Sequence, residues 1–249
     1  MKFIASSLLF LFICTSGFSQ EKPFNIYAKA GIQAGGPIYH SETIVSKSGA
    51  PGFNPLVGLG VSYNLLDELS VSLEAFYSRR KVTYKSTVQN QWYRDKVTVS
   101  VNNQPYVYEV ETIFTGETKG KFDIQYIEIP LNLHYIIDSK WSLQTGAYYA
   151  RAISRKNKGT ATGIVGRTDI PEPNTVDHKE YDYSNHVNTH FSGVLVGAQY
   201  AVSPRLSADL RGTFSFRSLY NERWDGLTYR LRDLYLQLSV NYYFRKRSI

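Results

Sequence analysis

The stretch Gln125-Tyr-Ile-Glu-Ile-Pro-Leu-Asn-Leu-His-Tyr-Ile-Ile137 decides the fold class of this chain. Apolar and polar residues alternate along it with a period of two, which predicts a β-strand with one apolar and one polar face. The run is longer than a usual strand of a globular protein and matches the roughly 9–11 residues of a tilted membrane-spanning strand. The stretch therefore favours a transmembrane strand over a strand of a soluble β-sandwich.

Seven other segments alternate in the same way. They span residues 24–36, 57–64, 69–77, 141–149, 191–200, 206–216 and 234–244. The connections alternate in length, being long in every case except the short polar turns at residues 65–68, 138–140 and 202–204. An even number of antiparallel strands, with short turns at one end and long loops at the other, is typical of outer-membrane barrels, whose short turns face the periplasm.

The predicted fold is all-β: a single eight-stranded antiparallel transmembrane β-barrel with short periplasmic turns and long extracellular loops. Side chains can fill the interior of a barrel of this size, so a wide aqueous pore is not expected. Within the long connection 79–121, two alternating segments flank turn residues at 102–105, which predicts a protruding hairpin over Val97–Ile113. Residues 154–187 are expected to be a long loop.

The amino-terminal residues 1–19 resemble a secretory signal peptide, because Lys2 precedes an apolar run from Phe3 to Cys14 and small residues follow. The barrel domain is expected over residues 20–249. Cys14 is the sole cysteine, so the mature chain is expected to contain neither a disulfide nor a reactive thiol. No later apolar run approaches the roughly 20 residues of a transmembrane helix. The pattern indicates export to the cell outer membrane.

Three motifs carry a resemblance to a known family: Tyr126-Ile-Glu-Ile-Pro-Leu131, Leu143-Gln-Thr-Gly-Ala-Tyr-Tyr149 and Val240-Asn-Tyr-Tyr-Phe244. With these motifs the chain resembles the PorT-like outer-membrane β-barrel family of Bacteroidetes over essentially all of its mature length. The resemblance implies an integral outer-membrane barrel. It also implies a link to protein secretion, with which the branch that gives the family its name is associated.

The alternation places six titratable residues inside the predicted barrel, where they are expected to form a polar network: Lys29, Glu74, Glu128, His134, Asp209 and Arg211. Four of these lie at a similar distance from the short turns, so they can pair across a narrow interior. Unpaired buried charges are costly, so we expect a plug of salt bridges and hydrogen bonds. Arg211 is expected to pair with Glu74 in preference to Asp209.

Basic residues gather where the strands meet the long loops, in three clusters that are predicted to form a rim: Arg79, Arg80, Lys81, Arg151, Arg155, Lys156, Arg217 and Arg230. Removal of the signal peptide takes one positive charge from the formal net charge of +7, and the remainder favours anionic partners. The rim is interpreted either as a solvated surface or as a belt that meets lipopolysaccharide phosphates, for which arginine is suited.

A hydrolase inside the barrel would need a base such as His134 and a carboxylate such as Glu128 to orient it. Six residues of strand separate the two by about 20 Å, which is too far for a hydrogen bond. The sequence contains no phosphate-binding glycine loop, nucleophile elbow or zinc signature. No catalytic site, cofactor or nucleic-acid partner is expected.

Histidines and carboxylates also gather near the third long connection, where they include Asp177, His178, Asp182, His186 and His190. Four-residue spacing on an extended strand separates two side chains by about 13 Å, so no metal site is expected. The sequence thus predicts a non-enzymatic structural or docking component of the outer membrane. Its partners would be membrane lipids including lipopolysaccharide, and an envelope or secretion protein reached through the extracellular loops. A narrow porin-like channel is the alternative, and a lumenal outer-membrane hydrolase is the third.

Overall fold

The computed structural model describes residues 24–38, 42–221 and 230–245, and the expected signal peptide lies outside these ranges. The described residues form ten β-strands and one short 3-10 helix. They are β1 (Phe24–Ile38), β2 (Ile44–Pro51), β3 (Pro55–Leu66), β4 (Leu69–Val101), β5 (Gln104–Ile136), β6 (Trp141–Arg167), β7 (Ile170–Asp182), η1 (Ser184–His186), β8 (His190–Ser203), β9 (Leu206–Ser218) and β10 (Arg232–Tyr243).

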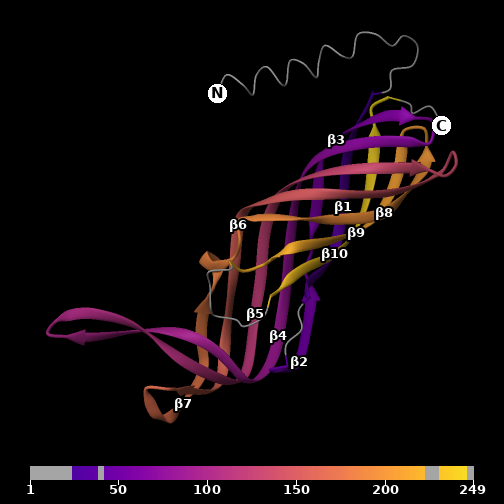
Figure 1. Ribbon diagram of the computed structural model, residues 1–249. Helices are drawn as coiled ribbons and strands as arrows, with labels where there is room; N and C mark the ends of the chain where they lie inside the picture. The colour runs from indigo at the N-terminus through magenta and orange to yellow at the C-terminus, as the bar shows by residue number, and fades with distance from the viewer. Residues whose placement is uncertain (1–23, 39–41, 222–229, 246–249) are drawn as a thin grey trace, which may run out of the picture.

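Eight strands close into a ring in the order β1-β3-β4-β5-β6-β8-β9-β10, and β10 pairs with β1 to complete it (Figure 1). Every neighbouring pair in the ring is antiparallel. The alternating stretch that begins at Gln125 forms the barrel part of β5, between β4 and β6. The prediction of an eight-stranded antiparallel barrel is confirmed.

The alternation along each barrel strand separates a polar interior from an apolar exterior. On β5, Glu128 and Asn132 are buried, whereas Ile129, Leu131 and Leu133 are exposed. Exposed apolar side chains of this kind surround the barrel and fit the hydrocarbon layer of a membrane. Aromatic side chains favour the membrane–water boundary. Three aromatic pairs lie at the short-turn end of the barrel: Phe24 with Tyr63, Trp141 with Tyr200, and Tyr242 with Phe244.

Short turns join the barrel strands at one end, where β1 begins and β10 ends (Figure 1). In the turn between β5 and β6, the carboxylate of Asp138 accepts hydrogen bonds from the backbone N–H groups of Lys140 at 2.7 Å and Trp141 at 2.8 Å. These bonds stabilise the charged form and lower the pKa of Asp138. None of the described residues forms a helix long and apolar enough to cross a membrane.

At the other end, β4, β5 and β6 continue far beyond the barrel, with lengths of 33, 33 and 27 residues (Figure 1). The predicted hairpin over Val97–Ile113 is the tip of a longer β4–β5 hairpin. Its turn residues Asn102 and Asn103 have φ values of 52° and 61°, a left-handed conformation that asparagine tolerates and that two-residue hairpin turns require. The loop predicted over residues 154–187 is wrong, because β6 extends to Arg167 and returns as β7.

We call the region beyond the barrel the distal sheet: β2, residues 79–101, 104–123 and 154–167 of the three long strands, and β7. Its strand order is β2-β4-β5-β6-β7. On β4 the buried Val82 and Val88 continue the inward series of the barrel, while Thr83 and Lys85 between them are exposed. The outward residues change from apolar to polar where the strand leaves the hydrocarbon layer, so the pattern resembles a loop although the strand continues.

Candidate functional site

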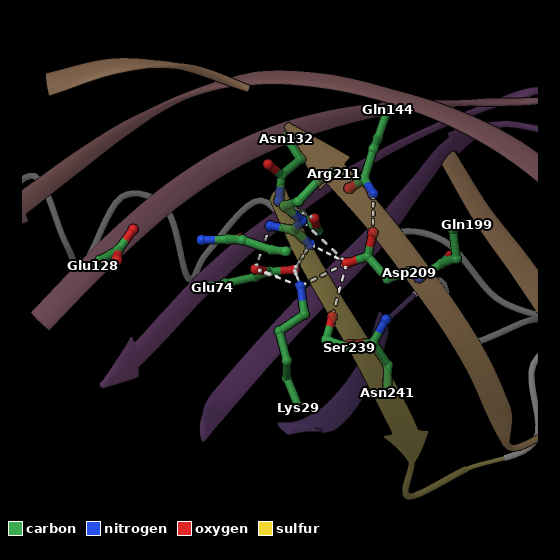
Figure 2. A network of polar contacts seen from close by, with 12 residues as sticks. Lys29, Glu74, Glu128, Asn132, Gln144, Gln199, Asp209, Arg211, Ser239 and Asn241 are labelled. Carbon is green, nitrogen blue, oxygen red and sulfur yellow. Dashed lines mark hydrogen bonds and ion pairs between the residues drawn. The ribbon is translucent and has the colours of Figure 1, made fainter. Parts of the chain in front are cut away.

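Four charged side chains meet inside the barrel (Figure 2). Nζ of Lys29 lies 2.9 Å from Oε1 of Glu74 and 2.8 Å from Oδ2 of Asp209. Arg211 donates to the two oxygens of Glu74 at 2.9 and 3.0 Å, and its Nε donates to Asp209 at 3.1 Å. We call these four residues the central cluster. Its carboxylates accept further hydrogen bonds from Tyr27, Gln144 and Ser239.

The central cluster is electrically balanced, since two cations face two carboxylates. Each of its four side chains is at most 2% exposed, so bulk water does not solvate these charges. The sequence placed these residues at a similar depth on β1, β4 and β9, and the structure brings them into contact. The expected pair between Arg211 and Glu74 is present, and Arg211 also bonds to Asp209. The arrangement supports a sealed interior rather than a reaction centre, because every charge has a partner.

A second group of charges lies where β4 passes from the barrel into the distal sheet. Arg80 on β4 donates through Nη2 to Glu128 at 3.0 Å and through Nη1 to Asp233 at 3.1 Å. Its guanidinium carbon lies 4.8 Å from the ring centre of Tyr126 and 4.7 Å from that of Tyr235, which places the cation between two aromatic faces. We call Arg80, Glu128 and Asp233 the upper cluster. It sets a single cation against two buried carboxylates.

Arg80 was expected on the basic rim, and this assignment is wrong. The residue is 2% exposed because it occupies an inward position of β4, two residues after the buried Ser78. The strand had been expected to end near Tyr77, and the residues after it were grouped by charge rather than by parity. Because the strand continues, successive side chains still alternate, so Arg79 faces outward and Arg80 faces inward.

Arg155 is also misplaced by the rim prediction. The register between β5 and β6 shifts next to Gln125, where β6 contains an additional residue. Such a bulge moves the following side chains to the other face of the sheet. Arg155 therefore turns toward the interior, where its Nη1 donates to the carbonyl oxygen of Val187 at 2.6 Å and to Oγ1 of Thr189 at 3.0 Å.

His134 and Glu128 belong to separate networks. Nε2 of His134 lies 2.8 Å from Oγ of Ser72, which also accepts a hydrogen bond from Asn132 at 3.1 Å. A serine beside a histidine is the pairing that activates a nucleophile in hydrolases. Here, however, Ser72 is 1% exposed and lies inside the barrel, so a lipid ester has no access to its hydroxyl in the described structure.

Apolar side chains fill the interior around the upper cluster and beyond it, toward the distal sheet. We call them the apolar plug. They come from β5, β6 and β8 and from the segments that precede β8 and β10, and each is at most 6% exposed: Phe122, Ile124, Tyr126, Tyr148, Ala150, Ala152, Val187, Phe191, Leu195, Leu219, Tyr220 and Leu231. The plug and the two charge clusters together occupy the barrel interior with side chains over most of its length.

The other predicted rim residues are at least partly accessible. Arg79 forms a two-point ion pair with Asp123, with Nε–Oδ1 and Nη2–Oδ2 distances of 2.8 and 2.7 Å. Lys81 is half-buried, and the remaining four rim residues are exposed: Arg151, Lys156, Arg217 and Arg230. The rim is therefore a set of cations on the outer surface with an acidic residue among them.

The histidines near β7 and β8 do not converge. Nδ1 of His178 lies 2.6 Å from its neighbour Asp177, and the ring of His190 stacks on Tyr149. Among the residues that the structure describes, no three His, Cys, Asp or Glu side chains lie close enough to hold a metal ion.

Sequence reasoning missed Asp233, which completes the upper cluster, and Gln144, which bonds to Asp209. The signal for Asp233 was present, because the inward series Tyr235, Gln237, Ser239 extends back to it by two residues. The missing information was the position at which β10 begins.

Comparisons with known proteins place the chain in a family. The family model for the outer membrane protein beta-barrel domain matches residues 18–221. Among solved structures, Ail, the attachment invasion locus protein of Yersinia pestis, is similar with a TM-score of 0.40 and 11% identity, covering 89% of this chain and 99% of that chain. Neisserial surface protein A is similar with a TM-score of 0.37 and 13% identity, covering 90% of this chain and 99% of that chain. The outer membrane protein OprG from Pseudomonas aeruginosa is similar with a TM-score of 0.36 and 12% identity, covering 90% of this chain and 98% of that chain. No curated protein matches the sequence.

Proposed function

The chain belongs to the outer membrane protein beta-barrel domain family and is located in the outer membrane, and from this premise we propose that it is a closed, non-enzymatic barrel that presents the distal sheet as a docking platform. The observation that carries the proposal is the length of β4 and β5, which continue as one ladder from Leu69 to the turn at Asn102 and back. A barrel that only seals or anchors does not require this extension. A platform for another molecule does.

The filled interior supports a docking role over a narrow channel. A channel needs a continuous path of water, whereas the central cluster, the upper cluster and the apolar plug place buried side chains at successive levels. Opening such a path would strand buried ions, each at a cost of several kcal/mol. The inaccessible hydroxyl of Ser72 likewise supports a non-enzymatic role.

We also propose that the docking partner is a protein of the cell envelope, with secretion as the process. The support is the resemblance of the Tyr126–Leu131 and Val240–Phe244 motifs to the PorT-like family. These motifs belong to barrel strands, so the resemblance concerns the scaffold, and the partner would contact the distal sheet.

Crosslinking in native membranes tests the docking role. In the test variant, residues 89–115 are replaced by an Asn-Gly turn, which joins the paired residues Val88 and Gly116 and leaves the barrel intact. We expect the trimmed variant to fold but to lose crosslinked products that the wild type forms. The matched control, Asn103→Gly, keeps the full hairpin and should keep the products. Unchanged products in the trimmed variant would exclude the tip as the docking site.

Labelling with a membrane-impermeant thiol reagent tests the orientation. Asn103→Cys at the hairpin tip should be labelled on whole cells, whereas Asp67→Cys in the short turn between β3 and β4 should be labelled only after the outer membrane is opened. We expect removal of the signal peptide to take away the sole cysteine, Cys14, and with it any background labelling. The opposite pattern would place the distal sheet in the periplasm and overturn the proposal.

The accessible rim residues should stabilise the barrel in lipopolysaccharide. Each cation near a phosphate contributes about 1 kcal/mol, less at high salt. Combined replacement of Arg79, Lys81, Arg151 and Lys156 by Gln should lower the thermal unfolding temperature in lipopolysaccharide-containing bilayers and leave it nearly unchanged in neutral detergent. A control with exposed cations at the short-turn end, Lys140→Gln and Arg205→Gln, should show no such difference. An equal loss in both media would make the rim an ordinary solvated surface.

A further inference from the structure

A cavity of about 840 Å³ lies on the inner face of the distal sheet. Its wall includes the buried side chains Val82, Val88, Phe114 and Phe122 from β4 and β5, and Leu231, just before β10, adds another. Small-molecule sites in proteins typically have volumes of about 300–1,000 Å³ and mostly apolar linings. In size and lining, the cavity therefore matches a site for one small ligand.

The polar atoms of the aromatic wall are already bonded to one another. The hydroxyls of Tyr84 and Tyr181 lie 2.8 Å apart, and the amide of Asn157 donates to Tyr84 at 3.2 Å. Tyr220 donates to the same asparagine at 2.8 Å. The tyrosines therefore present mainly their rings to the cavity. Against this aromatic wall, a sugar or another ligand with many hydroxyls would bury polar groups without partners, which is unfavourable, whereas a hydrocarbon would not.

Paired glycines let the rings lie against the sheet. Gly116 and Gly163 face each other across β5 and β6. A Cβ atom on Gly163 would lie 2.3 Å from the carbonyl oxygen of Thr115 and 3.0 Å from the ring of Phe114. One on Gly159 would lie 2.2 Å from the carbonyl oxygen of Lys119 and 2.4 Å from the hydroxyl oxygen of Tyr181. The rings of Phe114 and Tyr181 thus pack directly over glycines, where a side chain would displace both the ring and the neighbouring strand.

Charged residues lie only at the accessible part of the lining. Lys47 on β2 and Lys179 on β7 contact the cavity from its own face of the sheet, and both are exposed. Glu180 and Asp182 also border the cavity, but they pair with Thr160 and Lys158 and share the opposite face of the sheet. The strands β2 and β7 form the two edges of the distal sheet and take no part in the barrel ring. The cavity thus combines a buried apolar wall with a charged mouth, which is the pattern that an amphiphile complements.

We propose that this cavity binds a single-chain amphiphile from the external medium, with the hydrocarbon chain against the buried wall and the polar head at the charged mouth. Phe122, Tyr220 and Leu231 belong to both the cavity lining and the apolar plug, so the cavity has a closed floor. The ligand is therefore held at the cell surface and is not passed into the barrel. The inference rests on the surface exposure of the distal sheet proposed above.

The inference is tested by titrating the protein in phospholipid nanodiscs with a fluorescent fatty acid, dansyl-undecanoic acid. Nanodiscs are used because detergents are themselves single-chain amphiphiles and would compete for the cavity. We expect saturable binding above the background of empty nanodiscs. Ala161→Phe, on the cavity wall, should weaken binding by at least about tenfold, because the ring displaces the equivalent of about two buried methylene groups. Thr118→Phe, on the neighbouring strand, should act in the same way.

The matched control is Thr160→Phe, which adds the same ring to β6 on the opposite face of the sheet and should bind as the wild type does. Dansyl-glycine, which lacks the chain, should bind at least about tenfold more weakly than the fatty acid. Equal binding by wild type and Ala161→Phe, or equal binding of both probes, would overturn the proposal. Nanodiscs expose both faces of the barrel, so this result does not depend on the orientation that thiol labelling tests.

Discussion

Replacement of Arg80 by Met is expected to lower the free energy of unfolding by at least about 3–5 kcal/mol, the usual cost of removing one partner from a buried ion pair. The upper cluster has a single cation, so the change leaves the carboxylates of Glu128 and Asp233 facing each other without a counter-ion. Methionine keeps much of the side-chain volume between Tyr126 and Tyr235. The loss therefore reports the charge rather than a cavity.

Urea unfolding in lipid vesicles measures this effect, and Arg79→Gln provides the neighbouring control. Arg79 forms its ion pair with Asp123 at a partly exposed position, with 36% of the arginine side chain accessible, so its removal should cost no more than about 1 kcal/mol. The triple variant Arg80→Met, Glu128→Gln, Asp233→Asn should regain much of the loss. Similar urea midpoints for Arg80→Met and Arg79→Gln would show that Arg80 behaves as an exposed rim residue, which would contradict the upper cluster.

Arg211→Ala is expected to destabilise the barrel by a similar amount, about 3–5 kcal/mol. It leaves Lys29 alone against Glu74 and Asp209, and it removes the four hydrogen bonds that Arg211 donates to these two carboxylates. Alanine additionally creates a space in a packed interior, which adds to the loss. The variant should unfold at a lower urea concentration than the wild type, while the β-strand content of its folded state should be unchanged.

The control for this prediction is Arg151→Ala, which removes an exposed arginine from the same barrel and should change stability by less than about 0.5 kcal/mol. A second variant, Arg211→Lys, keeps the charge but loses the two-point geometry, so it should fall between the wild type and Arg211→Ala. A midpoint for Arg211→Ala equal to that of Arg151→Ala would show that the central cluster contributes nothing to stability.

The barrel could be predicted from sequence because one physical rule acts along its whole length. In the hydrocarbon layer, each strand must be apolar on one face, and the polar residues of the other face mark the interior. The same rule located Lys29, Glu74, Asp209 and Arg211, whose side chains alternate with exposed apolar neighbours. Residues inside the membrane-spanning part were therefore assigned to the correct face.

The prediction failed where that rule stops acting. Beyond the hydrocarbon layer both faces of β4 carry polar residues, so the end of the apolar pattern was mistaken for the end of the strand, and Arg80 was grouped with its outward neighbour. Arg155 was assigned to the wrong face for a different reason. A single bulge residue on β6 exchanges the inward and outward positions that follow it, and the amino-acid composition does not reveal it. The cavity was not predictable either, because it depends on which strands pair beyond the barrel.

The central claim is that side chains close the barrel interior, and current through single molecules in a planar bilayer tests it most directly. The purified wild-type protein, inserted in bilayers at high salt, is expected to leave the current at the level of the lipid alone. The central cluster, upper cluster and apolar plug fill the described interior with buried side chains, so we expect no ion path through it. Steady open-state steps that grow with salt concentration would contradict the account, because they would require a continuous aqueous path through the barrel.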